Sequence, residues 1–343
     1  MPLPPGGLST LADDAAETLF LSDADVRAAL TWAEAIDAIR DAYGAQTDSA
    51  ALPPRTMARA EGAWLRTLSA MPSDCEYMGV KLIAASPATR RASYLVALFD
   101  RSTTALVALL DGNHVTGMRT AATSAVAIDA LAPRRPLRVA VIGSGFEAHN
   151  HVAAAAGIRD IAELVVFSPT DANRRRFAEE AASTLDLPAR AAASAEDAVR
   201  DADLVLAAAR SRDESPTVRG AWLRPDATVV SIGSTLPEQR ELDVEAIRRA
   251  SVIVADVPDE VAAETGDMIA AAAQGVELGG KLLSLADVVG GAGALRRTEG
   301  SLAVYKSVGS ALQDVTISEL CLRRARERGF GRALGQTISP VSK

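Results

Sequence analysis

Several residue types are scarce in this chain, and each scarcity excludes a class of protein. The 343 residues include only two cysteines, Cys75 and Cys321, which are far apart and form no C-x-x-C pair. The cysteines therefore predict neither a disulfide framework nor a zinc site. We expect both to be buried packing residues in a reduced, cytoplasmic protein.

The chain also lacks a long hydrophobic segment and an excess of basic residues. Spanning a bilayer takes about 20 consecutive apolar residues, and the stretch from 268 to 276, among the longest here, is about half that length. The start MPLPPGGLST has no basic patch before an apolar run, so no secretory signal is predicted. A formal net charge of −8 disfavours nucleic acid. We expect neither a membrane nor a nucleic acid as partner.

Alanine dominates what is present. It supplies 69 residues, whereas aromatic residues make up 4% of the chain. The 48% hydrophobic content therefore reflects a strong helix former rather than a membrane-like composition. The length is sufficient for two domains of ordinary size.

Residues 1–132 carry helix, strand and helix signals in that order. Ser22 precedes an apolar pattern with a period of 3.6, which predicts one or two helices. Between residues 64 and 110, short runs rich in β-branched and aromatic residues predict four or more strands. A long alanine-rich helix follows and ends near the PRRP segment at 133–136, which we interpret as a domain boundary.

Apolar strands and helical stretches alternate after this boundary, a pattern typical of a parallel sheet covered on both faces. The predicted fold class is therefore α/β, with a doubly wound Rossmann sheet over residues 133–314. The closing residues 315–343 have helical spacing, and no strand is expected after the helix. We expect this segment to pack on the first domain.

A glycine-rich turn follows the strand LRVAVI and opens a helix, with the pattern G-x-G-x-x-A. The first glycine permits the tight turn, the second lets the backbone approach a pyrophosphate, and the alanine lets the helix pack close to the sheet. The pyrophosphate then lies at the helix N-terminus. We predict that this turn binds a dinucleotide through Gly143, Ser144, Gly145, Phe146, Glu147 and Ala148.

The tip of the second strand indicates which dinucleotide binds. An acidic side chain there accepts the ribose 2′-hydroxyl of NAD, but this chain has Ser168 and Thr170, with Arg174 in the next helix. These groups can hydrogen-bond and pair with a 2′-phosphate, which favours NADP(H). Asp171 leaves NAD(H) open, as does the alternative that Thr170 only caps the helix.

Three cations outside this region are candidates for binding an anionic substrate. Lys81 lies in the apolar run MGVKLIA, where an ammonium group is costly unless a carboxylate pairs with it. Arg119 follows the turn GNHVTGM, and because an arginine in a helix's first turn opposes the dipole, we expect it to serve an anion or a neighbouring carboxylate. Arg55 follows two prolines and can form a bidentate fork with a carboxylate. Solvent-exposed positions are the alternative for Lys81 and Arg55.

The histidines predict no metal site. His149 and His151 stand two apart in one helix and point to different faces, which does not suit zinc. His114, in the turn before Arg119, fits a polar turn residue better than a substrate contact.

Together these patterns resemble the ornithine cyclodeaminase/mu-crystallin family along nearly the whole chain. The resemblance implies a Rossmann domain over 133–314 beside a split α+β substrate and dimerisation domain built from 1–132 and 315–343, and hence a homodimer. It also implies that Arg55, Lys81 and Arg119 hold the substrate carboxylate. The matching segments are Pro54-Arg55, Met71-Pro72, Gly79-Val80-Lys81, LFD at 98–100, LLDG…TGMRTAATSA at 109–125, VIGSGFEA, DADLVLAAA, SIGS…REL at 231–242 and YKSVGSALQD at 305–314.

One position departs from the family pattern. Ornithine cyclodeaminases carry an aspartate after the SIG-type strand, where this chain has Thr235, and a threonine is no general base near neutral pH without activation. We place Thr120 at the cofactor, and Ser234 and Thr235 at the cofactor or the substrate amino group. Asp314 belongs either near the nicotinamide or at a helix start.

We therefore expect an NAD(P)(H) oxidoreductase acting on a 2-amino, 2-imino or 2-oxo acid, including N-substituted, opine-like amino acids, with Lys81 moving the proton. A redox-neutral cyclodeaminase and a non-enzymatic mu-crystallin-like binding protein are the alternatives. Tyr94, Arg66 and Arg91 are possible pocket residues, and either arginine facing the cleft would indicate a second carboxylate in the substrate.

Overall fold

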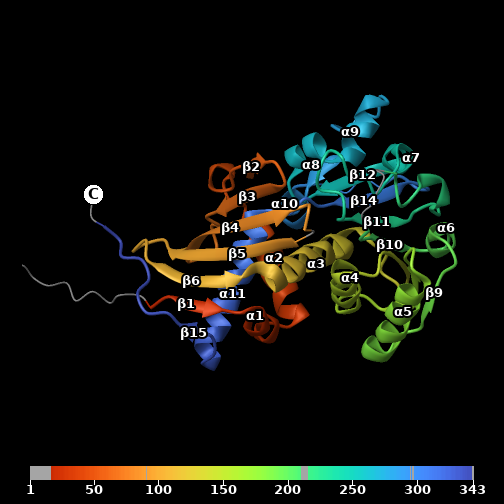
Figure 1. The fold of residues 1–343 in the computed structure, drawn as a ribbon. Coiled ribbons are helices and arrows are strands. Elements are labelled where there is room, and N and C mark those ends of the chain that lie inside the picture. The colour runs from red at the N-terminus through yellow and green to blue at the C-terminus, as the bar shows by residue number, and fades with distance from the viewer. Residues whose placement is uncertain (1–16, 90, 210–214, 294, 296, 342–343) are drawn as a thin grey trace, which may run out of the picture.

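The computed structural model describes residues 17–341 apart from residues 90, 210–214, 294 and 296. These residues form two β-sheets side by side, with α3 (Gly112–Leu131) running between them and α11 (Ala311–Arg328) behind the first sheet (Figure 1). The predicted α/β class, with a parallel Rossmann sheet and a second, mixed sheet, is confirmed.

The first sheet is mixed and has the strand order β15-β1-β6-β5-β4-β3-β2. Its strands are β1 (Leu19–Leu21), β2 (Thr56–Ala60), β3 (Ala63–Ala70), β4 (Tyr77–Ser86), β5 (Arg91–Asp100), β6 (Leu106–Asp111) and β15 (Arg332–Ala333). Neighbours from β2 to β6 are antiparallel, while β1 runs parallel to β6. The predicted run of four or more strands is confirmed.

Two short strands contradict the expected ends of this region. Residues 19–21 form a strand before the first helix, and β15 follows the last helix, where no strand was expected. β15 pairs with β1 through Leu19 and Phe20, so the two ends of the chain meet in one sheet. Strands of two or three residues carry too little periodicity to be recognised alone.

Capping residues begin the first two helices, α1 (Asp23–Ala29) and α2 (Trp32–Gly44). The Ser22 hydroxyl accepts a hydrogen bond from the backbone N–H of Asp25, and the Thr31 hydroxyl accepts one from Glu34. Each satisfies an N–H that has no partner within its helix. The predicted cap at Ser22 is confirmed.

The second sheet is parallel throughout, in the order β13-β12-β14-β11-β10-β7-β8-β9. Its strands are β7 (Leu137–Ile142), β8 (Ile161–Phe167), β9 (Ala189–Ala191), β10 (Leu204–Ala207), β11 (Thr228–Ser231), β12 (Ala250–Ala255), β13 (Leu282–Ser284) and β14 (Leu302–Lys306). The strand order reverses between β7 and β10, and ligands of such sheets bind at this point.

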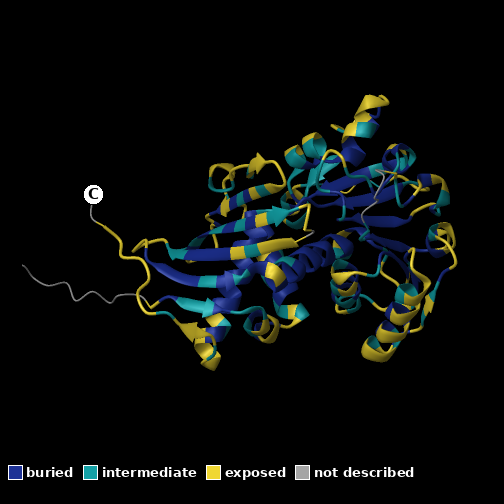
Figure 2. Ribbon diagram, viewed as in Figure 1, coloured by how far each residue is buried: buried dark blue, intermediate teal, exposed yellow. Residues whose placement is uncertain are grey.

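Helices cover both faces of the second sheet, and their outer surfaces are exposed while the strands are buried (Figure 2). They are α4 (Phe146–Ala156), α5 (Asp171–Leu185), α6 (Ala195–Val199), α7 (Val244–Arg249), α8 (Pro258–Glu264), α9 (Gly266–Ala273) and α10 (Leu285–Val289), with a 3₁₀ turn at η2 (Gly220–Trp222). The other described 3₁₀ turn, η1 (Ser49–Ala51), lies between α2 and β2. None of the described helices is long and apolar enough to cross a membrane.

Two largely buried helices connect the sheets. α3 (Gly112–Leu131) leads from β6 to the second sheet, and α11 (Ala311–Arg328) leads from β14 back to the first. Alanines along α3 let the helix lie close to its neighbours, and one apolar cluster includes residues of both sheets. Cys75 and Cys321 are buried and unpaired, as predicted.

Candidate active site

A cavity of about 220 Å³ lies where the first sheet, α3 and the carboxyl ends of the second sheet meet. The strands β3, β4 and β5 supply one wall, and the segments after β10, β11 and β14 supply another. Its lining residues are Trp64, Arg66, Lys81, Ile83, Tyr94, Thr116, Arg119, Thr120, Glu147, Ala208, Ile232, Gly233, Thr235, Leu236, Ser307, Val308 and Gly309. The switch point of a Rossmann sheet is where such a cavity is expected.

Lys81 is the most deeply buried cation that lines this cavity, with 1% of its surface exposed. Its ammonium group donates to Asp314 Oδ1 at 2.9 Å and to the Thr116 hydroxyl at 2.7 Å. Burial lowers the pKa of Lys81 to about 8, although Asp314 counteracts the shift. A lysine with this pKa can hold or release a proton near neutral pH.

Arg119 shares the same carboxylate. Its Nε lies 3.1 Å from Asp314 Oδ1, and its Nη1 donates to Gln313 Oε1 at 2.7 Å. The expectation that Arg119 stands in a helix's first turn is wrong, because α3 begins at Gly112 and the GNHVTGM segment is itself helical. The guanidinium is placed by Asp314 rather than by the helix dipole.

Asp314 stands in the first turn of α11 and is completely buried. The helix start is one of the two places expected for it. Gly309, just before this helix, has a φ of +83°, and a Cβ there would lie 2.5 Å from Arg119 Nη1. Any side chain at this position would displace the guanidinium, so glycine is required here.

Arg55 lies beside this group but does not line the cavity. Its guanidinium pairs with Glu260 at 3.1 Å and with Glu264 at 2.7 Å, both on α8. It also donates to the carbonyl oxygens of Val308 and Thr235, which do line the cavity. Lys81 and Arg119 are thus brought together as predicted, whereas Arg55 stands behind the opposite wall.

The glycine turn after β7 has the geometry that a pyrophosphate requires. Gly143 has a φ of +123°, and a Cβ on it would lie 2.6 Å from the carbonyl oxygen of Ala208. A Cβ on Gly145 would meet nothing within 4 Å, so open space lies over the N-terminus of α4. Gly145 caps α4 without a side-chain hydrogen bond, and Ala148 is fully buried against the sheet. The residues present fit a dinucleotide.

The fingerprint reaches the cavity through Glu147, which belongs to the first turn of α4 and lines the wall near Lys81. Ser144 and Gly145 lie nearer the surface, and Phe146 is 41% exposed. The same turn therefore borders open space at Gly145 on one side and the cationic cavity at Glu147 on the other.

The tip of β8 holds Arg174 as the sequence suggested. Its guanidinium donates to the carbonyl oxygen of Ser168 at 3.0 Å, stacks over Phe167 and pairs with Asp171 at 2.9 Å. Thr170 occupies the N-cap position of α5 but makes no side-chain capping bond. A cation is thus present at the strand tip, beside one carboxylate.

Thr120, Ser234 and Thr235 belong to the walls of the cavity or to its support. Thr120 lines it from α3, and its hydroxyl donates to the carbonyl oxygen of Thr116. Thr235 lines it from the loop after β11. Ser234 is buried and donates to the carbonyl oxygen of Gln239, which braces this loop.

Glu241 is a buried carboxylate that was not singled out from the sequence. It connects the ends of β10 and β11 through hydrogen bonds. Glu241 accepts hydrogen bonds from Ala209 N–H at 3.0 Å, Gly233 N–H at 2.7 Å and the Ser231 hydroxyl at 2.8 Å. Burial raises its pKa to about 7, against the attraction of Lys306. Glu241 lies in the family segment SIGS…REL, but spacing alone did not show where its side chain points.

The histidines occupy other places. His151 is buried, contacts the Ser124 hydroxyl at 2.9 Å and has a pKa lowered by burial to about 4, so it is a neutral packing group. His149 stacks on Phe177, with ring centroids 4.1 Å apart. His114 lines a separate cavity between α3 and α4. Among the described residues, no cluster of three or more histidine, cysteine or acidic side chains suits a metal ion.

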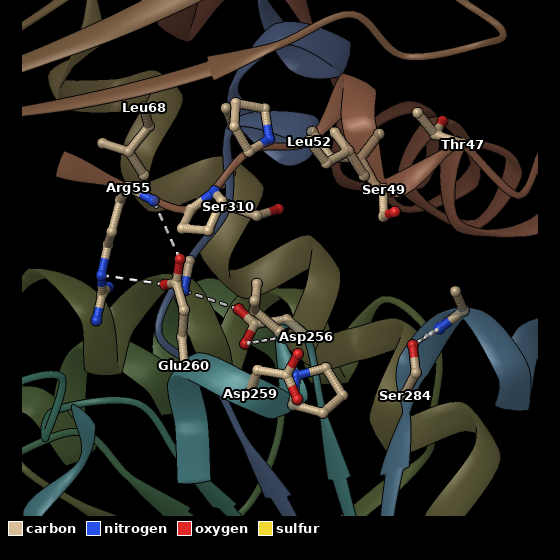
Figure 3. Close-up of a pocket in the computed structure, with 18 of the residues that line it drawn as sticks. Thr47, Ser49, Leu52, Arg55, Leu68, Asp256, Asp259, Glu260, Ser284 and Ser310 are labelled. Carbon is tan, nitrogen blue, oxygen red and sulfur yellow. Dashed lines mark hydrogen bonds and ion pairs between the residues drawn. The ribbon is translucent and has the colours of Figure 1, made fainter. Parts of the chain in front are cut away.

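A larger cavity of about 660 Å³, shown in Figure 3, is lined by residues 309–312 at the start of α11. Asp256, Asp259 and Glu260 line it, and Arg55 points its guanidinium at Glu260. The Asp256 carboxylate already accepts hydrogen bonds from the Ser307 hydroxyl at 2.6 Å and from the Gly309 N–H at 2.7 Å. Its acidic lining disfavours an organic acid, so the smaller cavity is the better substrate site.

Two residues of the site were not recognised from the sequence: Thr116, which lines the smaller cavity, and Gln313, which lies behind it and holds Arg119. Thr116 accepts the hydrogen bond from Lys81, and Gln313 connects Arg119 to Tyr43 through a 2.8 Å hydrogen bond. In the sequence, the feature that could have identified Thr116 was its position one helical turn before Thr120. Gln313 had no signal except its position next to Asp314.

This chain is similar in sequence to known proteins that share one reaction class. A Bacillus cereus Δ(1)-pyrroline-2-carboxylate reductase is 28% identical over 265 residues, which cover 76% of this chain and 81% of the relative. The mouse ketimine reductase mu-crystallin is 31% identical over 225 residues, 66% of this chain and 67% of the relative. Both relatives are reductases of imines, which agrees with the predicted reaction class.

A solved structure has the same fold. The Δ(1)-pyrroline-2-carboxylate reductase of Thermococcus litoralis, in complex with NADH and L-proline, superposes with a TM-score of 0.85 at 28% identity, covering 92% of this chain and 99% of the other. The family model described as ornithine cyclodeaminase/mu-crystallin matches residues 16–329. The chain therefore belongs to the ornithine cyclodeaminase/mu-crystallin family.

Proposed function

We propose that this protein is an NAD(P)H-dependent reductase of 2-imino acids, working in the reverse sense as an amino acid dehydrogenase. The observation that carries the proposal is the joint placement of Lys81 and Arg119 on Asp314, in a cavity that also includes Glu147 of the dinucleotide turn. The family membership and the imine-reducing relatives support the same reaction.

The two cations are suited to hold the carboxylate of the substrate. Arg119 has further N–H groups beyond those engaged by Asp314 and Gln313, and Lys81 has a third ammonium hydrogen. Charge-assisted hydrogen bonds from both would fix the neighbouring carbon of the substrate. A bound nicotinamide supplies the hydride for that carbon.

Lys81 is the group proposed to hold the proton. Reduction of a C=N bond adds one hydride to carbon and needs one proton at nitrogen, and the Lys81 ammonium can donate it or keep the imine protonated. Its pKa of about 8 leaves it mostly charged at neutral pH and able to give up the proton. Asp314 stabilises the charged form and orients it.

Arg55 is proposed as a third carboxylate ligand, as the family resemblance implies. Support comes from its hydrogen bonds to the carbonyl oxygens of Thr235 and Val308, which place the guanidinium directly behind the cavity wall. Glu260 and Glu264 hold it there, so binding substrate requires Arg55 to exchange one of these partners.

We propose NADP(H) as the preferred cofactor, with Arg174 pairing with the 2′-phosphate. Arg174 is supported by its place at the tip of β8 beside Ser168. Arg174→Ala is expected to lower kcat/KM for NADPH about tenfold while NADH changes less than twofold. Steady-state kinetics with both cofactors measures this, and an equal loss with both would contradict the assignment.

We also propose a homodimer, on the strength of the family resemblance. Light scattering during size-exclusion chromatography should then give about twice the chain mass of 35.7 kDa. The assignment to the cytoplasm stays a prediction from cysteine usage.

A spectrophotometric screen tests the proposed function. Purified protein is mixed with NADPH or NADH and with Δ1-pyrroline-2-carboxylate, or with 2-oxo acids plus ammonia or methylamine, and oxidation at 340 nm is expected. Conversion of L-ornithine to proline and ammonia without net cofactor change would favour a cyclodeaminase instead. Cofactor binding with no oxidation by any of these compounds would favour a binding protein.

A further inference from the structure

Arg66 is a second cationic feature of the substrate cavity, apart from the Lys81 and Arg119 pair. It lies on β3, lines the cavity and is only 6% exposed. Its direct cross-strand partner is Ile83, which pairs in turn with Tyr94, and both of these residues line the cavity. The other strand arginine that the sequence suggested, Arg91, is exposed at the start of β5 and lies outside the cavity.

The guanidinium of Arg66 has no carboxylate partner among the described residues. Four lysine or arginine residues are buried among the described residues. Three of them pair with an aspartate, namely Lys81, Arg119 and Lys306, whereas Arg66 does not. The Arg66 Nε is buried without a hydrogen bond, and the guanidinium lies over the Trp64 ring, 5.3 Å from its centroid.

The neighbouring carboxylates are already engaged. Glu260 and Glu264 are close enough to influence Arg66, but both are paired with Arg55. Burial and the charge of Arg55 lower the pKa of Arg66 to about 10, so the side chain is still positively charged at neutral pH. A buried charge without a partner is destabilising, and an anion bound in the cavity would relieve that cost.

The position of Arg66 suits the far end of a small substrate. Lys81 pairs across the sheet with Leu68, two residues from Arg66, so Lys81 and Arg66 are diagonal neighbours on one face. Such neighbours lie about 7–8 Å apart in an antiparallel sheet. The wall around them is formed by Ile83, Tyr94 and Trp64, within a cavity of only about 220 Å³.

We propose that Arg66 binds a second carboxylate and that the substrate is therefore a short dicarboxylic 2-imino acid, formed from a dicarboxylic 2-oxo acid and an amine. This inference rests on the proposed function. Lys81 and Arg119 bind the carboxylate next to the reacting carbon, and Arg66 binds the one at the other end. A monocarboxylic substrate leaves Arg66 unpaired and binds more weakly.

The test compares dicarboxylic and monocarboxylic substrates in three proteins: wild type, Arg66→Gln and Arg66→Lys. The measured quantity is the ratio of kcat/KM for oxaloacetate or 2-oxoglutarate with ammonia to that for pyruvate with ammonia. Wild type should prefer a dicarboxylate by at least about tenfold, and Arg66→Gln should lower the ratio about 100-fold. Arg66→Lys should restore part of it, and the exposed control Arg91→Gln should leave it unchanged.

The outcomes separate this inference from the proposed function. Equal losses on both substrate classes in Arg66→Gln, or a wild type that reduces only monocarboxylic imines, would overturn the role of Arg66 and leave the reductase function intact. If no substrate is reduced, the proposed function fails. The carboxylate site at Arg66 is then tested by the shift in melting temperature that a dicarboxylic ligand causes. L-aspartate or L-glutamate stabilising wild type but not Arg66→Gln would then support the second carboxylate site, and equal or absent stabilisation would overturn it.

Discussion

Lys81–Asp314 and Lys306–Asp267 are both lysine–aspartate pairs with completely buried side chains, at 2.9 Å and 2.6 Å. The first borders the substrate cavity, and its aspartate is shared with Arg119. The second is enclosed in the Rossmann domain, where Asp267 also accepts the backbone N–H groups of Glu241 and Leu242. Burial of an ion pair therefore does not identify a functional site, whereas a cavity on one side of the lysine does.

The largest expected effect comes from removing the lysine that borders the cavity. Lys81→Met should lower kcat/KM for imine reduction roughly 1000-fold, because both the carboxylate ligand and the proton donor are lost. NADPH affinity, measured by fluorescence titration, should stay within severalfold because the dinucleotide turn is untouched. A comparable loss of NADPH affinity would show that the substitution damaged the fold.

The matched change in the enclosed pair should act on stability instead. Lys306→Met leaves Asp267 buried without its cation, which should lower the free energy of unfolding by about 3–5 kcal/mol. Urea denaturation measures this, and activity per folded molecule should change less than threefold. The double variant Lys306→Met/Asp267→Asn removes the unpaired charge and should recover part of the loss. A large loss of activity without a loss of stability would contradict the assignment of Lys306 to a purely structural pair.

The lysine that borders the cavity should also determine the pH dependence of the reaction. Lys81 has a pKa lowered to about 8, so it is charged below that pH and loses its proton above it. Because the reaction needs the ammonium form, log kcat/KM should fall with a slope of about −1 above pH 8. Asp314, Arg119 and Glu147 also act on this lysine. A profile flat to pH 10, with unchanged NADPH binding, would exclude Lys81 as the proton donor.

The smallest expected effects come from the hydroxyls that accept hydrogen bonds from the two lysines. Thr116→Val removes the acceptor beside Lys81 and should reduce kcat/KM about tenfold with little change in stability. Ser231→Ala removes the acceptor beside Lys306 and should cost about 1 kcal/mol of stability with activity nearly intact. Kinetics and urea denaturation of both variants measure these effects. A stability loss in Thr116→Val together with an activity loss in Ser231→Ala would contradict the distinction between the two pairs.

The sequence was sufficient for the fold because its signals are local. The glycine turn, the alternation of apolar strands with helices, and the Ser22 cap each depend on a few adjacent residues. The exceptions are β1 and β15, whose formation depends on pairing between the two ends of the chain. Pairing of that kind is decided by tertiary contacts and leaves no local pattern.

The candidate site was only partly predictable for the same reason. Lys81 attracted attention because a lysine in an apolar strand needs a partner, but nothing local showed that the partner is Asp314. Arg66 and Arg91 were equivalent in the sequence, and the register of β3 against β4 is what turns Arg66 toward the cavity. The helix boundary at Gly112 was misjudged because glycine, asparagine and histidine resemble a turn.

The passage of α11 back to the first sheet has a consequence for synthesis of the protein. Lys81 and Arg119 leave the ribosome long before their shared carboxylate, which lies 233 and 195 positions further along the chain. The nascent chain therefore carries two cations, one on β4 and one on α3, without their counter-ion while the whole second sheet is being made. Lys81 and Arg119 can pair with Asp314 only when translation has almost finished, so a prematurely terminated chain lacking α11 cannot form the arrangement proposed for the site.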